Sequence, residues 1–150
     1  MPRRILLLAW AFTLSLALWA QKGLHVAQLF DGRYHKRKDA TEVLMKGRQL
    51  SAYKLSLFRS LTLGPQSGNA TVIEPLVKAD GRSAIDKELT TRGGRLAMAF
   101  YQLPSVGKTR RYLYYSNTGA AAGGAQTSQI TLIYMEGTAT LDELKRSFKK

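Results

Sequence analysis

The last third of the chain has the clearest pattern of hydrophobic positions, three short runs rich in Tyr, Phe, Ile, Leu and Thr. These residue types fit a pleated, half-buried surface, so the pattern predicts strands at Arg95–Leu103, Arg110–Asn117 and Gln129–Glu136. The connections at Pro104–Gly107 and Asn117–Ser128 are rich in Gly, Pro, Ser or Asn. They leave no room for crossover helices, so we expect an antiparallel meander.

A short helix is predicted to close the chain at Leu141–Phe148, after Gly137 ends the third strand. Thr140 and Glu143 have the spacing of a capping box, in which each residue satisfies a backbone N–H at the start of the helix. The expected buried stripe consists of Leu141, Leu144 and Phe148.

The segment Val72–Arg92 has the strongest helical pattern, and Gly93-Gly94 supplies its end. Its apolar stripe comprises Ile73, Leu76, Val77, Ala84, Ile85 and Leu89. Pro75 is acceptable in a first turn. Gly81 lies in the middle, where it marks either a close approach to the sheet or a break with Asp80 capping a second segment.

The earlier part of the chain is less clear. Leu24–Phe30 has a three-residue apolar repeat that predicts a helical turn, and Thr41–Lys46 reads as a strand. Gln49–Leu63 fits both a helix and an alternating strand, and its length favours a helix of about three turns.

These elements predict a single α+β domain. The expected architecture is a mainly antiparallel sheet of three or four strands with helices packed on one face, ending in a strand, a glycine and a capped helix. A length of 150 residues suits one domain with one core.

The first twenty residues have the pattern of a signal peptide. Arg3 and Arg4 precede the uncharged apolar run Ile5–Leu18, which is shorter than the roughly 20 residues needed to span a bilayer. Cleavage would follow Ala20 or Ala17, and Ala20 is favoured slightly. We thus expect a signal peptide at 1–20 and a periplasmic or secreted domain at 21–150, whose formal charge falls from +13 by two to +11.

Candidate catalytic chemistry is sparse in this sequence. The absence of cysteine excludes disulfides, including a disulfide-linked partner, and thiolate metal sites. His25 and His35 form no metal-binding motif, and no cofactor motif is present. Glycosidase chemistry would need two acids facing each other across a cleft, which the sequence does not place. Four acids share the helical segment predicted at 72–92: Glu74, Asp80, Asp86 and Glu88.

Basic and aromatic residues supply the candidate binding site. Five of the seven tyrosines lie in the predicted meander, and Tyr101, Tyr112 and Tyr114 have parities that could share one sheet face. Cations beside aromatic platforms bind glycans, lipid headgroups or single-stranded nucleic acid; export argues against nucleic acid as the physiological partner. The candidate binding residues are Lys36, Arg37, Lys38, Lys108, Arg110, Arg111, Tyr112 and Tyr114. The alternative is that the tyrosines complete the core and the cations are solvated.

Several segments resemble a family of small exported proteins of unknown function from anaerobic Gram-negative gut bacteria. They are Gly23–Phe30, Ala40–Gly47, Phe58–Leu61, Gly94–Pro104 and above all Thr131–Leu144. The resemblance covers essentially the whole mature chain and implies a periplasmic or secreted α+β domain. It supplies no catalytic or binding residues.

The sequence therefore favours a non-enzymatic envelope or secreted binding module for an anionic or glycan partner. The alternatives are a small carboxylate-based hydrolase and a structural partner of another envelope protein. A cleft with converging acids would favour the hydrolase, and an exposed apolar surface would favour a protein partner.

Overall fold

The computed structural model describes residues 23–65, 69–119 and 129–148. Its elements are η1 (His25–Phe30), β1 (Ala40–Lys46), η2 (Gly47–Tyr53), β2 (Leu55–Leu63), α2 (Asn69–Gly81), β3 (Asp86–Arg92), β4 (Arg95–Val106), β5 (Thr109–Asn117), β6 (Ile130–Gly137) and α4 (Leu141–Phe148), where η denotes a 3₁₀ helix. The proposed signal peptide and most of the Asn117–Ser128 loop lie outside the described residues. No helix of the described part is long and apolar enough to cross a membrane.

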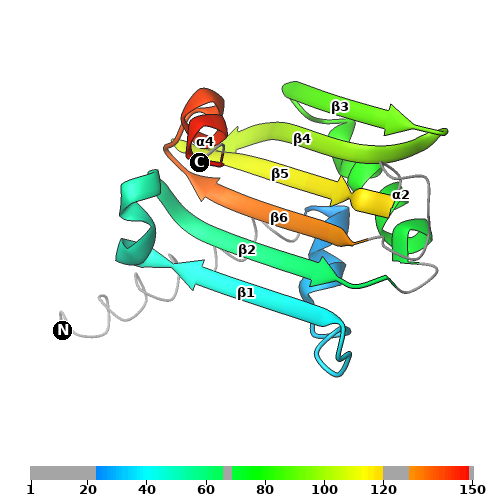
Figure 1. The fold of residues 1–150 in the computed structure, drawn as a ribbon. Coiled ribbons are helices and arrows are strands. Elements are labelled where there is room, and N and C mark those ends of the chain that lie inside the picture. The colour runs from blue at the N-terminus through cyan, green and yellow to red at the C-terminus, as the bar shows by residue number, and fades with distance from the viewer. Residues whose placement is uncertain (1–22, 66–68, 120–128, 149–150) are drawn as a thin grey trace.

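The strands form one six-stranded antiparallel sheet in the order β1-β2-β6-β5-β4-β3 (Figure 1). The prediction of three or four strands is therefore wrong. The meander of β4, β5 and β6 is present as expected, but β3 extends it on one side. On the other side the β1–β2 hairpin pairs with β6, which comes from the far end of the chain.

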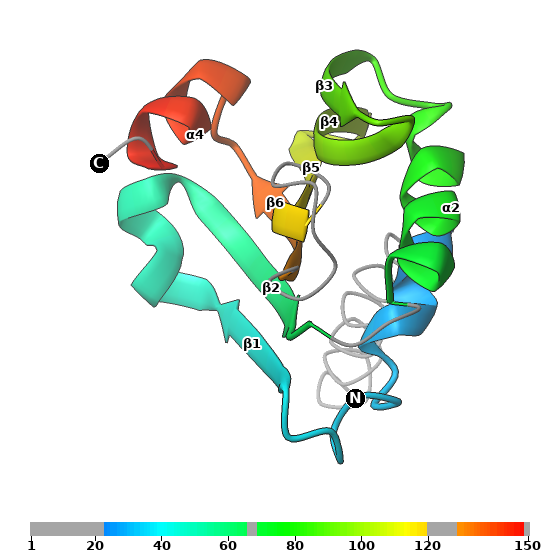
Figure 2. The same cartoon turned by 45° about the vertical axis from the view of Figure 1, so that its right-hand side comes forward.

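Helices lie on both faces of the sheet, not on one face as predicted. On the first face, η1 and α2 cover the larger core, which includes Leu61, Leu113 and Leu132 from the central strands. On the second face a smaller core forms around Tyr112 and Met135, with α4 and η2 over it. Figure 2 shows α2 beside η1 and, apart from them, α4 over the other side of the sheet.

The predicted helix at Val72–Arg92 is two elements. Helix α2 ends at Gly81, and the chain returns as edge strand β3, Asp86–Arg92. Gly81 lies at a close approach to the sheet, because a Cβ there would clash with the ring of Tyr101. The helix also starts earlier than predicted, at Asn69, so Pro75 lies inside it rather than in its first turn.

The ambiguous segment Gln49–Leu63 is mainly strand. A 3₁₀ turn ends at Tyr53, Lys54 takes a left-handed conformation with φ of 55°, and β2 follows. Of the two alternatives that the sequence left open, the alternating strand is the one formed, and the three-turn helix that the length favoured is not. Leu57, Leu61 and Leu63 all reach the first core.

The helical turn predicted at Leu24–Phe30 is present as η1. Val26, Leu29 and Phe30 are buried. The Asp80 carboxylate accepts hydrogen bonds from the backbone N–H groups of His25, at 2.7 Å, and Val26, at 2.9 Å. Asp80 therefore caps η1 from the end of α2, not a second helical segment.

Candidate functional site

The second face of the sheet is apolar across its middle strands but only partly covered. Cross-strand pairing places Phe100, Tyr114 and Ile133 side by side on β4, β5 and β6. Successive side chains of a strand point to opposite faces, so this row faces away from the larger core. An apolar sheet face is normally buried against another layer, and here the layer consists of the short helices α4 and η2.

Helix α4 is held over one end of this face. The predicted capping box is confirmed: Glu143 N–H donates to the Thr140 hydroxyl, and Thr140 N–H donates to the Glu143 carboxylate, each at 3.2 Å. Leu144 is buried against the second core. The Lys54 ammonium lies 2.9 Å from the Glu143 carboxylate, and this contact is the main reason why the pKa of Glu143 lies below its ordinary value.

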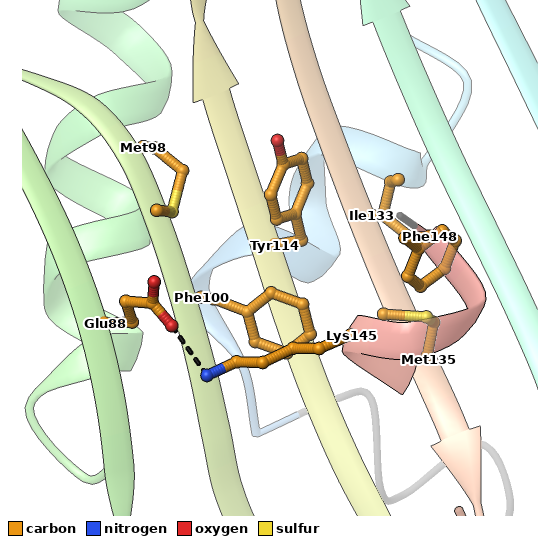
Figure 3. Close-up of a pocket in the computed structure, with 8 residues that line it drawn as sticks. All are labelled: Glu88, Met98, Phe100, Tyr114, Ile133, Met135, Lys145 and Phe148. Carbon is orange, nitrogen blue, oxygen red and sulfur yellow. Dashed lines mark ion pairs between the residues drawn. The ribbon is translucent and has the colours of Figure 1, made fainter. Parts of the chain in front are cut away.

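A groove of about 500 Å³ lies beside α4 on this face (Figure 3). It is lined by Glu88, Met98, Phe100, Tyr114, Ile133, Met135, Lys145 and Phe148. The floor comes from β4, β5 and β6, one side from β3 and the other from α4. The ring of Phe100 meets that of Tyr114 edge to face, with centroids 5.8 Å apart. The size lies in the range of small-molecule sites.

The charged groups of the groove neutralise each other. Lys145 reaches from α4 past Phe100 toward β3, and its Nζ lies 2.6 Å from Oε2 of Glu88. The hydrogen bond to this carboxylate raises the pKa of Lys145, which keeps the ammonium charged. The remaining lining is methionine, aromatic and aliphatic, a combination that adapts to apolar ligands of varied shape.

Phe148 lies between this groove and a second, smaller one of about 280 Å³. The second groove opens toward η2 and is lined partly by Met45, Tyr53 and Phe58. Phe148 is 53% exposed, so its prediction as a buried residue is wrong. It forms a shared wall of the two grooves instead.

Hydroxyl groups border the apolar row on the side away from α4. The register places Ser116 on β5 opposite Thr131 on β6, Thr131 opposite Thr62 on β2, and Thr62 opposite Thr41 on β1. These hydroxyl residues point to the groove face, because residues two apart on a strand share a face. Ser116 is two residues from Tyr114, and Thr131 is two residues from Ile133. The open face thus passes from an apolar band to a hydroxyl band.

The predicted cations of the first loop lie at the opposite end of the sheet from the hairpin cations. Lys36 and Lys38 precede β1, whose first residue pairs with the last residue of β2. Arg37 has a structural role: it binds Asp39 at 2.7 Å and Asn69 at 2.9 Å, which joins the start of β1 to the start of α2.

The hairpin residues of the predicted site divide between the two faces. Arg110, Tyr112 and Tyr114 alternate on the groove face, and Arg111 points to the other. Arg110 donates to the Thr138 carbonyl, and Arg111 to that of Pro104. Lys108 is exposed in the turn.

The predicted tyrosines differ in their burial and in the face of the sheet on which they lie. Tyr112 is fully buried and donates to the Ala139 carbonyl, and burial raises its pKa. Tyr114 is half-buried and lines the groove. Tyr101 packs in the larger core on the opposite face, so the expectation that Tyr101, Tyr112 and Tyr114 share a face is wrong. Binding of an anionic partner by the cations stays a prediction.

The acids predicted on one helix are distributed over two elements with separate roles. On α2, Glu74 accepts from the Leu96 N–H and binds Lys78, and Asp80 caps η1. Asp86 and Glu88 lie on β3. Within the described part, the groove lining includes one carboxylate, Glu88, and no group of three His, Asp or Glu side chains could hold a metal ion.

Sequence reasoning missed most of the groove lining, although a signal for it exists. In β6 the apolar residues Leu132, Ile133, Tyr134 and Met135 are consecutive. Such a strand has apolar residues on both faces and therefore indicates a second apolar surface of the sheet. The ion pair between Lys145 and Glu88 could not be predicted from the sequence, because it depends on where α4 crosses the sheet.

Comparison with protein families gives a match that covers nearly the whole chain, residues 13–148, to a model described as "Family of unknown function (DUF6108)". Comparisons with curated proteins and with solved structures find no match. The chain therefore belongs to the family of unknown function DUF6108.

Proposed function

We propose that this chain is an exported, non-catalytic binding module that holds the acyl chain of a lipid in the groove beside α4. The observation that carries the proposal is the apolar row of Phe100, Tyr114 and Ile133, over which α4 leaves an open groove. Burying apolar surface contributes about 25 cal/mol per Å². A flexible hydrocarbon chain that lies along the row would bury its own apolar surface and that of the row.

The polar groups around the groove suit the other end of such a ligand. The hydroxyl band offers donors and acceptors on the side away from α4, while the paired Glu88 and Lys145 add no net charge. An amphipathic molecule can therefore lie with its chain on the apolar band and its polar end over the hydroxyls. The sequence alone favoured an anionic or glycan partner, with lipid headgroups among the possible ligands. The present proposal names a lipid held by its acyl chain and does not involve the separated cations.

Binding can be measured by titrating the purified protein with a fluorescent dodecanoic acid derivative. Met98 is half-buried in the floor of the groove. Met98→Lys places a charge there, so we expect affinity to fall by about tenfold or more. Phe148→Ala removes an exposed wall and should weaken binding severalfold. The matched control is Leu89→Lys, because Leu89 is 48% exposed on β3 and is not part of the groove lining.

Thermal melts of each variant separate loss of binding from loss of folding. Equal affinities for the wild type, Met98→Lys and Phe148→Ala would contradict the proposal, as would a wild type that does not bind the probe. Loss of binding in the Leu89→Lys control alone would place the site on another surface.

Export is the second part of the proposal and rests on the basic start and the apolar run Ile5–Leu18. The expected mature protein begins near Gln21. Mass spectrometry of the protein made in a Gram-negative host checks this, and recovery of the intact chain from the cytoplasm would contradict it. The groove proposal does not depend on this result.

A further inference from the structure

The two edges of the sheet differ in how they are protected from pairing with another strand. Edge strand β3 contains an irregularity in its register at Thr90 and Thr91 and forms an ion pair to α4 through Glu88. Edge strand β1 is regular over all seven residues that pair with β2. Natural proteins protect edges with bulges, charges or covering elements, because an unpaired edge is a template for another strand. In the described part of the chain, the outer edge of β1 pairs with no strand.

Strand β1 also exposes apolar side chains on both of its faces. Leu44 is 54% exposed and Val43 is 38% exposed. Leu44 pairs with Arg59 on the side of the larger core, and Val43 pairs with Ser60 on the groove face. Exposed apolar residues on both faces of a regular edge strand are typical of a strand that gains a neighbour.

The sequence of β1 is complementary to itself when it is reversed. In the run Glu42-Val43-Leu44-Met45-Lys46, opposite charges stand at equal distances on either side of Leu44, and two apolar residues flank it. An antiparallel pair of identical strands centred on Leu44 therefore places each Glu42 opposite the other copy's Lys46. It also places each Val43 opposite the other copy's Met45. Opposite charges and apolar pairs are the favourable cross-strand neighbours.

Neighbouring registers lack this complementarity. Two residues that lie directly opposite each other in the paired strands point to the same face of the sheet. The two-fold axis must therefore pass through a residue, and the nearest alternative registers are centred one residue away from Leu44. Centring the pair on Val43 opposes Glu42 to Leu44 and Lys46 to Ala40. Centring it on Met45 opposes Leu44 to Lys46, and centring it on Glu42 opposes two carboxylates. Like charges directly opposite each other destabilise a sheet, so the pairing centred on Leu44 is favoured.

The side chains of this pair are available for a partner. Glu42 uses one oxygen for His35, 2.6 Å away, while its other oxygen is buried and has no hydrogen-bond partner in the described part. Lys46 is exposed and takes part in none of the ion pairs of the described residues. An ammonium group brought opposite Glu42 would add a partner of opposite charge to this carboxylate.

We propose that the chain forms a two-fold dimer in which β1 pairs antiparallel with β1 of a second copy, centred on Leu44. The two sheets then become one continuous sheet. A two-fold axis through paired edges is perpendicular to the sheet, so both grooves open on the same side. This dimer does not depend on the proposed lipid ligand.

Sedimentation analysis of the purified protein over a concentration series tests the proposal. We expect the wild type to dimerise and Leu44→Lys to weaken the dimer at least about tenfold, because the two new lysines would lie directly opposite each other across the two-fold axis. The matched control is Ile85→Lys, since Ile85 is 63% exposed beside the other edge strand. It should leave dimerisation unchanged. A monomeric wild type, or a dimer unaffected by Leu44→Lys, would overturn the proposal.

Charge reversal tests the register. Glu42→Lys and Lys46→Glu should each weaken the dimer severalfold, because each opposes like charges twice. Mixing the two variants should restore dimerisation to near the wild-type level, since both lysines of one copy then face the two glutamates of the other. Failure of the mixture to recover, with both variants folded by thermal melt, would overturn the pairing centred on Leu44.

Discussion

At the scale of single residues, Gly137 lies against backbone atoms of the neighbouring strand that leave no room for a side chain. It pairs with Leu55 on one side and with Arg110 on the other. A Cβ there would lie 2.3 Å from the carbonyl oxygen of Lys54 and 2.6 Å from Cα of Leu55. The same Lys54 oxygen accepts hydrogen bonds from the N–H groups of Thr138 and Ala139. The absence of a side chain at Gly137 thus permits β6 to reach the start of β2.

We predict that Gly137→Ala lowers the free energy of unfolding by about 3 kcal/mol, at the upper end of the usual cost of overpacking, because the clash is with backbone. Urea denaturation measures it. Gly23→Ala is the control, since a Cβ at Gly23 meets nothing within 4 Å, and it should change stability by less than about 0.5 kcal/mol. Similar stabilities for the two variants would contradict this account of Gly137.

At the scale of elements, the residues of α4 predict that it is a helix, but where it lies on the sheet depends on the whole fold. The capping box joins residues three apart in sequence, so it could be predicted. The exposure of Phe148 could not, because helical periodicity gives the side of the helix that is apolar but not how far the sheet extends beneath it. Leu144 meets the second core, whereas Phe148 projects beyond it between two grooves.

The two apolar residues of α4 should therefore differ in their contributions to stability. Leu144→Ala should lower the free energy of unfolding by about 2–5 kcal/mol, as buried leucine truncations do. Phe148→Ala should cost less than about 1 kcal/mol because the side chain is half exposed. Denaturant melts of both variants test the ordering, and a larger loss for Phe148→Ala would mean that α4 packs differently.

Edge strand β3 was one of the elements that the sequence predicted least well, whereas edge strand β1 was expected at Thr41–Lys46 and found at Ala40–Lys46. Asp86–Arg92 continues the helical spacing of α2, but its side chains are mostly exposed, so no buried stripe distinguishes a helix from an edge strand there. Its strand identity depends on hydrogen bonds to β4. The meander, in contrast, was predictable because its strands are neighbours in both sequence and space.

At the scale of the whole molecule, the long-range arrangement determined which predicted site residues come together. The cations before β1 and those of the β4–β5 hairpin are separated by the length of a strand, about 20 Å for seven residues. Sequence spacing could not reveal this, because the β1–β2 hairpin pairs with β6 rather than with β4. The same pairing brings the second groove beside η2 and places β1 at an edge.

The contact between β2 and β6 also has a consequence for how the protein folds. Strands β3 to β6 can assemble through neighbours in sequence, and so can the β1–β2 hairpin, but the pair Leu63 and Ile130 closes a long stretch of chain. Loop-closure entropy must be lost before such distant contacts stabilise the chain. We therefore expect docking of the hairpin onto β6 to be the slow step of folding. Until it occurs, the inner edges of both halves are open, and a newly synthesised chain is at its most vulnerable to aggregation during that interval.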